Sequence, residues 1–107
     1  MGADLGGWMG GGRTVHLAVS GDIDMDTVDG LAALLREALA GEDVAEVVLD
    51  LAGAGFCDAT GIRELATAYS RASASGIRLR VTNVRPLVRR SLVITGLYGL
   101  LVTGDRG

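Results

Sequence analysis

Residues 46–75 of this chain read EVVLDLAGAGFCDATGIRELATAYSRASAS, and they contain the clearest structural pattern in the sequence. The run over residues 47–51 is almost wholly apolar, which is typical of a strand covered on both faces. A glycine-rich corner with Asp58 and Thr60 follows, where side-chain oxygens can accept hydrogen bonds from the free N–H groups that begin a helix. Apolar residues then recur at the spacing of one helical face, at Ile62, Leu65, Ala66, Tyr69 and Ala72. The stretch therefore predicts a strand, a tight corner and an amphipathic helix.

This corner is also the first candidate for a functional site. A carboxylate beside a hydroxyl at a helix N-terminus is a place where an anion or a phosphoryl group is readily held, because the first N–H groups of the helix are unpaired. Capping of the helix by Asp58 and Thr60 explains the same residues without any ligand. Both interpretations stay open on the sequence alone.

Two similar units lie on either side of this stretch. Residues 14–20 alternate as a strand, and an apolar stripe at helical spacing follows and ends at Gly41. Residues 77–81 alternate as a third strand, and Pro86 fits the first turn of a third helix, where its missing N–H costs nothing. Three such units predict an α/β fold with a small, mostly parallel sheet. The apolar end, residues 97–104, is expected to pack back on the domain as a short last strand.

In a parallel sheet, functional sites lie at the carboxyl ends of the strands. This rule places polar residues from three separate loops on one rim of the molecule. They are Asp22 and Asp24, Asp58 and Thr60, and Asn83 and Arg85. The rim is where we expect function to lie.

The composition limits what the protein can be. A chain of 107 residues is enough for one domain with a modest core, with residues 13–107 as the domain and the glycine-rich residues 1–12 as a flexible lead-in or a weak edge strand. The net charge of −3 and the scattered arginines argue against a nucleic-acid partner. No apolar run reaches the roughly 18 residues of a membrane span, and no secretory leader begins the chain, so we expect a cytoplasmic protein.

Several kinds of chemistry are excluded by missing residues. The chain has one cysteine, one histidine and no lysine, which excludes a CxxC metal site and a lysine-dependent phosphate site. A dinucleotide loop is also excluded, because Asp58 stands where the third glycine of GxGxxG is needed and would repel a pyrophosphate. Thr60 has no base nearby in the sequence to activate it. We expect neither catalysis, nor a metal, nor a cofactor.

Three segments carry motifs that point to one family. Residues 18–24, AVSGDID, contain a strand that ends in S-G-x-x-D. Residues 47–61, VVLDLAGAGFCDATG, are close to a hydrophobic strand followed by F-x-D-S-[ST]-G. Residues 83–97, NVRPLVRRSLVITGL, follow N-x-x-P-x-V-x-x-x-L-x-x-T-G-L. In order and spacing the chain resembles the STAS family, which includes the anti-sigma factor antagonists of bacterial partner-switching systems and domains of sulfate transporters.

The resemblance implies a small mixed sheet flanked by helices and a binding module rather than an enzyme. In such antagonists, this corner and its helix dock on an anti-sigma factor that is also a serine kinase. Carried over residue by residue, the docking positions are Asp22, Asp24, Asp58, Ala59, Thr60 and Gly61 on the rim, and Arg63, Glu64 and Thr67 on the helix.

The chain departs from the family at the position of the phosphoacceptor serine, which is Ala59 here. Two outcomes stay open: Thr60 is phosphorylated instead, or the protein binds its partner constitutively. Helix capping already explains Thr60, which favours constitutive binding. The alternative function is a STAS subunit of a transport or lipid-trafficking complex, in which the same helix binds an ATPase subunit. A third is a sensor of a small ligand.

Overall fold

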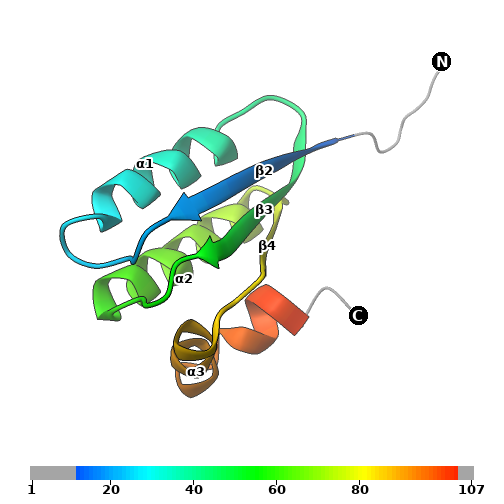
Figure 1. The fold of residues 1–107 in the computed structure, drawn as a ribbon. Helices are drawn as coiled ribbons and strands as arrows, with labels where there is room; N and C mark the ends of the chain where they lie inside the picture. Colours follow the sequence, from blue (N-terminus) through cyan, green and yellow to red (C-terminus); the bar gives the residue numbers. More distant parts are fainter. Residues whose placement is uncertain (1–11, 104–107) are drawn as a thin grey trace, which may run out of the picture.

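Strands and helices alternate through residues 12–103, the part of the chain that the computed structural model describes (Figure 1). The elements in order are β2 (Arg13–Ser20), α1 (Val28–Leu39), β3 (Val44–Gly53), α2 (Ala59–Ala74), β4 (Arg78–Thr82), α3 (Pro86–Ile94) and the short π-helical turn η1 (Gly99–Thr103). The predicted α/β fold is confirmed. The prediction for residues 1–12 falls almost entirely outside the described residues.

The three described strands form one parallel sheet in the order β2-β3-β4. Val15 lies opposite Val47, and Leu49 lies opposite Leu17 on one side and Val81 on the other. This register places the apolar residues of all three strands on the same face. Because all three strands are parallel, their carboxyl ends meet at one edge, as the predicted rim requires.

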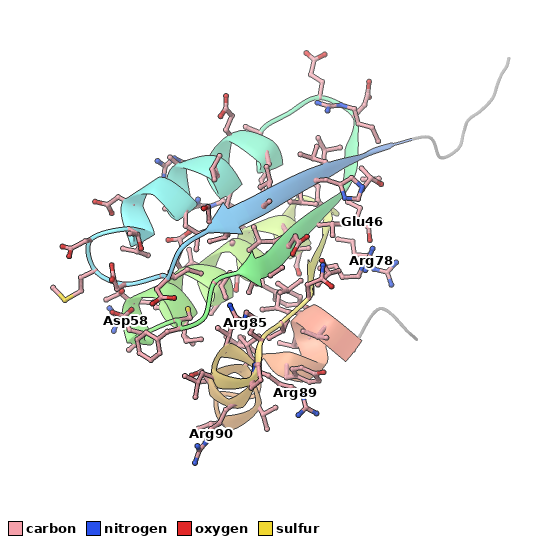
Figure 2. The ribbon with its side chains drawn as sticks, viewed as in Figure 1. Glu46, Asp58, Arg78, Arg85, Arg89 and Arg90 are labelled. Carbon is pink, nitrogen blue, oxygen red and sulfur yellow. The ribbon has the colours of Figure 1, made fainter. Side chains whose placement is uncertain are left out.

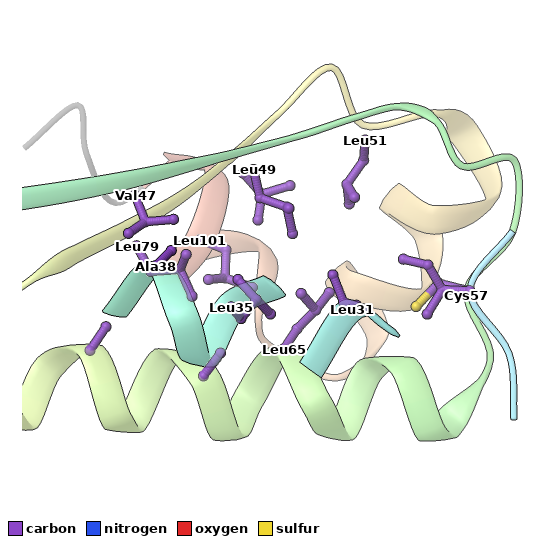
Figure 3. Packing of buried hydrophobic residues seen from close by; sticks show 14 of the residues in the cluster. Leu31, Leu35, Ala38, Val47, Leu49, Leu51, Cys57, Leu65, Leu79 and Leu101 are labelled. Atoms are coloured by element: carbon purple, nitrogen blue, oxygen red, sulfur yellow. The ribbon is translucent and has the colours of Figure 1, made fainter. Parts of the chain in front are cut away.

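Helices α1 and α2 pack on this apolar face and form the core (Figure 3). Leu35 of α1 and Leu65 of α2 are almost completely buried against Leu49 of β3. The opposite face of the sheet is largely polar, and there Arg80 forms an ion pair with Glu46 at 3.1 Å. Of the outward residues of β3, Val48 is buried while Glu46 and Asp50 are half-buried. The expected burial on both faces therefore holds only in the middle of β3.

The buried face of α2 differs from the predicted one by about one position. The buried residues are Gly61, Leu65, Ala68 and Ala72, whereas Ile62 and Tyr69 are half-buried at the edge of the core. The predicted stripe contains Leu65 and Ala72 but misses Gly61 and Ala68, because a pattern of large apolar residues does not report glycine and alanine. These small residues let α2 approach the core closely, and Ile62 and Tyr69 are then turned toward the C-terminal part of the fold.

The predicted last strand is wrong. After Gly96, whose φ of +80° ends α3, the chain turns into η1, and Leu101 is buried in the core. The N–H of Leu101 donates to the carbonyl of Leu97 at 2.9 Å, so the segment forms helical hydrogen bonds within itself. Helix α3 and η1 lie beyond β4, at the opposite edge of the sheet from β2 (Figure 1).

Gly61 is the position where the packing leaves no room for a side chain. A Cβ there would lie 2.5 Å from the Sγ of Cys57 and 2.5 Å from a methyl carbon of Ile23, and both side chains are buried. Gly30 of α1 is the opposite case, because a Cβ there would meet nothing within 4 Å. The two glycines provide a matched pair for measuring the packing.

We predict that Gly61→Ala lowers the free energy of unfolding by about 1 to 3 kcal/mol, because the added methyl overpacks the junction of α2 with its two loops. Gly30→Ala should raise it by about 0.5 to 1 kcal/mol through helix propensity alone. Urea unfolding followed by circular dichroism measures both changes. Equal effects of the two substitutions would contradict the packing described for Gly61.

Candidate functional site

The loop after β2 and the loop after β3 are joined beyond the end of the sheet. Ile23 and Cys57 form an isolated parallel bridge. The N–H of Ile23 donates to the carbonyl of Phe56 at 2.9 Å, and the N–H of Asp58 donates to the carbonyl of Ile23 at 2.9 Å. This pairing brings the segment of Asp22 and Asp24 beside the corner of Asp58, as the sequence predicted for the rim.

The carboxylates of Asp22 and Asp24 hold these loops in place. Asp22 Oδ1 accepts a hydrogen bond from the N–H of Gly55 at 3.0 Å, which links the two loops directly. Asp24 Oδ1 accepts from the N–H groups of Asp26 and Thr27, at 2.9 and 3.1 Å. Thr27 is the N-cap residue of α1, but its side chain makes no capping bond there. The turn before the helix is held by Asp24 instead.

Asp58 caps α2, as predicted. Its Oδ1 accepts from the N–H groups of Thr60 and Gly61, at 2.9 and 3.1 Å, and from the hydroxyl of Thr60 at 2.5 Å. The Thr60 hydroxyl is the largest cause that lowers the pKa of Asp58 below its usual value. Backbone N–H groups of Gly61, Thr60 and Met25 lower the pKa further, against an opposing effect of burial.

The two residues after the cap differ in their accessibility. Ala59 is exposed in the first turn of α2, and Thr60 is half-buried with its hydroxyl donated to Asp58. Gly61 is buried and provides space for Cys57 and Ile23. At this corner the methyl group of Ala59 therefore faces solvent, whereas the Thr60 hydroxyl is bonded to Asp58.

A groove of about 360 Å³ runs between the start of α2 and α3. Cys57, Ala59 and Ile62 line one side, and Ser91, Ile94 and Thr95 of α3 line the other, with Asp58 and Arg63 also in the lining. Helix α3 thus belongs to the site, although the residues singled out from the sequence end at Arg85. Its Leu87 and Val93 are 56% and 53% exposed. Among its apolar residues, α3 buries only Val88 and Leu92.

The remaining predicted positions lie on α2 and in the segment after β4. Arg63 lines the groove, and Thr67 is exposed one helical turn farther along, whereas Glu64 is half-buried. A guanidinium nitrogen of Arg85 and the carboxylate of Asp22 both approach Gly55, so Arg85 belongs to the rim. Asn83 is exposed at the end of β4 with a φ of 54°, where it serves the turn.

Cys57 is 2% exposed at the floor of the corner. Burial, and secondarily the nearby negative charge of Asp58, raises the pKa of its thiol from 9.0 to about 11. Within residues 12–103, no cluster of three or more His, Cys, Asp or Glu side chains is arranged to hold a metal ion. In the same range, the helices are too short or too polar to cross a membrane.

Comparison with known proteins agrees with the architecture. The family model described as "Mlab, STAS domain" matches residues 10–103. The STAS domain of a SulP transporter from Vibrio cholerae is 20% identical with a TM-score of 0.67, covering 86% of this chain and 70% of that one. A sulfate transporter family protein from Wolinella succinogenes is 20% identical with a TM-score of 0.70, covering 84% and 72%. At this identity the two structures establish a shared fold.

The buried thiol provides a test of the corner in its native state. With a pKa of about 11 in place of 9.0, the native protein carries about a hundredfold less Cys57 thiolate at about pH 8 than the unfolded chain. We predict that a disulfide reagent reacts with the native protein at least that much more slowly than with urea-unfolded protein. Similar rates in the two states would show that the corner is open.

The cap provides a test by pH. We predict that the midpoint of urea unfolding is highest for the wild type, lower for Asp58→Asn and lowest for Asp58→Ala. Asparagine keeps an acceptor oxygen for the cap, whereas alanine does not. Since folding lowers the pKa of Asp58, the charge contributes to stability above about pH 4, and this contribution is lost as the pH falls through the folded pKa. The difference between wild type and Asp58→Asn should therefore vanish in strong acid. A difference that stays constant there would contradict the assignment.

Proposed function

Because this chain belongs to the STAS domain family, we propose that it is a protein-docking module, and that its docking face is the corner from Asp58 to Gly61 together with the groove between α2 and α3. The observation that carries the proposal is a group of exposed apolar side chains in this region. Met25 is 73% exposed, Phe56 is 45% exposed and Ile94 is 75% exposed. Exposed apolar groups that gather on one small domain indicate a surface covered by another protein.

The arrangement of the corner supports binding without a phosphorylation switch. Ala59 has no hydroxyl, and the Thr60 hydroxyl is engaged by Asp58. A phosphate on Thr60 would add about −1.5 to −2 charges beside Asp58 and break the cap. We therefore propose that the protein binds its partner constitutively. Of the predicted docking residues, Ala59, Arg63 and Thr67 are exposed and available for direct contact.

For the partner, we propose an anti-sigma factor with serine kinase activity, so that the protein regulates transcription by binding that factor in the cytoplasm. The motif of the corner and the closing motif on α3 support this choice. The second candidate is a subunit of a transport or lipid-trafficking complex that binds an ATPase. The family description and the two transporter structures support this second candidate. Neither role requires chemistry by the domain itself.

One experiment separates these possibilities. The purified protein is mixed with a candidate anti-sigma kinase and ATP, and complex formation and intact mass are read together. A stable complex without a mass change supports constitutive binding. A gain of one phosphoryl group that disappears in Thr60→Ala would overturn it and move the switch to Thr60. Absence of both complex and modification, with the ATPase subunit of a transporter bound instead, favours the second candidate.

Substitutions at the corner test the docking face. We predict that Ala59→Glu and Asp58→Lys each weaken partner binding at least about a hundredfold, because an unmatched charge is costly to bury at an interface. Ala59→Glu should leave the fold intact, since a carboxylate is favourable in the first turn of a helix. Ala33→Glu, at an exposed position in the middle of α1, is the matched control. Unchanged affinity of Ala59→Glu in a verified complex would exclude this face.

A further inference from the structure

Charge is divided along this chain in an unusual way. Residues 20–58 contain ten aspartates and glutamates and a single arginine, Arg36. Residues 65–103 contain six arginines and no acidic residue at all. The net charge of −3 conceals this division.

The fold turns the division along the chain into a division in space. The acidic part forms the loop after β2, then α1 and β3, and the basic part forms most of α2, then β4 and α3. In the sheet, β4 of the basic part is an edge strand, and β3 of the acidic part lies beside it in the centre. The groove between α2 and α3 lies where they meet, with Asp58 at its corner and Arg63 in its lining.

Three arginines have guanidinium groups without a partner among residues 12–103: Arg63, which lines the groove, and Arg85 and Arg90 at α3. Arg89 differs, because its guanidinium lies over the ring of Tyr98 at 5.2 Å. Figure 2 shows Arg85, Arg89 and Arg90 at α3 and Asp58 at the corner of α2. Arg90 shares its helical face with Leu87 and Ile94, at spacings of three and four residues. The exposed apolar stripe of α3 is therefore flanked by unpaired positive charge.

We infer that the occupant of the groove is an amphipathic protein segment whose apolar side chains contact Ala59, Ile62 and Ile94 and whose carboxylates face Arg63 and Arg90. This inference rests on the proposed docking function and adds the chemistry of the partner surface. A concave apolar groove between two helices fits a helix or a turn with a matching apolar ridge. The unpaired arginines select the acidic members among such segments.

An anionic membrane also attracts arginines beside apolar residues, but the other flank of this groove argues against it. Asp24, Asp26 and Asp58 lie at the corner, and a negatively charged lipid surface would be repelled there. A protein segment can carry acidic residues on one side only. Its acidic side can then face the arginines while its other side lies against the aspartates. The observations therefore favour a protein.

Charge reversal on α3 tests the inference in the complex with the verified partner. We expect affinity to decrease in the order wild type, Arg90→Gln, Arg90→Glu, with a loss of at least about tenfold for the last, because it places like charges together. The loss should shrink between about 0.05 and about 0.5 M NaCl, because salt screens exposed charges. Arg71→Glu is the control, because Arg71 lies on the side of α2 that faces α1. Equal effects of Arg90→Glu and Arg71→Glu would overturn the inference.

A second measurement needs no knowledge of the partner. Two synthetic amphipathic peptides with the same apolar positions, one flanked by glutamates and one by lysines, are titrated into the labelled protein, and amide NMR shifts are followed. The inference predicts shifts at Ala59, Ile62 and Ile94 with the glutamate peptide, reduced in Arg90→Glu. A preference for the lysine peptide, or no difference between the peptides, overturns it.

Vesicles of phosphatidylglycerol and phosphatidylcholine provide the membrane comparison. One outcome would point to a lipid surface in place of the protein segment. In that outcome the protein binds the vesicles, Arg90→Glu abolishes this binding, and the two peptides bind equally. If the peptides are discriminated but no candidate kinase or ATPase binds, the proposed partner fails and the groove chemistry stands. If a partner binds and charge reversal has no effect, the groove chemistry fails alone.

Discussion

The carboxylate of Asp58 holds the corner from which α2 begins. It caps α2 through the N–H groups of Thr60 and Gly61 and accepts the Thr60 hydroxyl. The backbone N–H of Asp58 also donates to the carbonyl of Ile23, which ties the corner to the loop after β2. Free N–H groups at a helix start need an acceptor, and an ionised carboxylate is a strong one. The position of α2, and with it the floor of the groove, depends on this group.

The same interaction limits what the corner can do. Because the Thr60 hydroxyl is already donated to Asp58, it is poorly placed to act as a phosphoacceptor, and Ala59 presents only a methyl group. A serine with a free hydroxyl can be phosphorylated and so gain a doubly charged group. The exposed position of this corner is Ala59, which cannot be phosphorylated. The loss of a hydroxyl at one residue thereby supports a constitutive binding surface in place of a switch.

Much of the local structure could be predicted from particular residues. Asp58 indicated the cap of α2, and Pro86 indicated the first turn of α3. Two predictions differ from the structure. The stripe of α2 was correct at Leu65 and Ala72 but missed Gly61 and Ala68. The final strand was wrong, because residues 99–103 form helical hydrogen bonds within themselves. The spacing of apolar residues indicates neither the small residues on the buried face of α2 nor the helical form of the C-terminal segment.

The strand–helix order, the corner with its cap, the absence of a hydroxyl at Ala59 and the division of charge along the chain all follow from the amino-acid sequence. Each of these depends on residues close together or on a simple count. Tertiary packing alone brings Ser91 and Ile94 into one groove with Ala59 and Ile62, places Arg63 in its lining and sets Arg89 over the ring of Tyr98. These placements depend on how α3 packs beyond β4, because the burial of Val88 and Leu92 sets which face of α3 remains exposed.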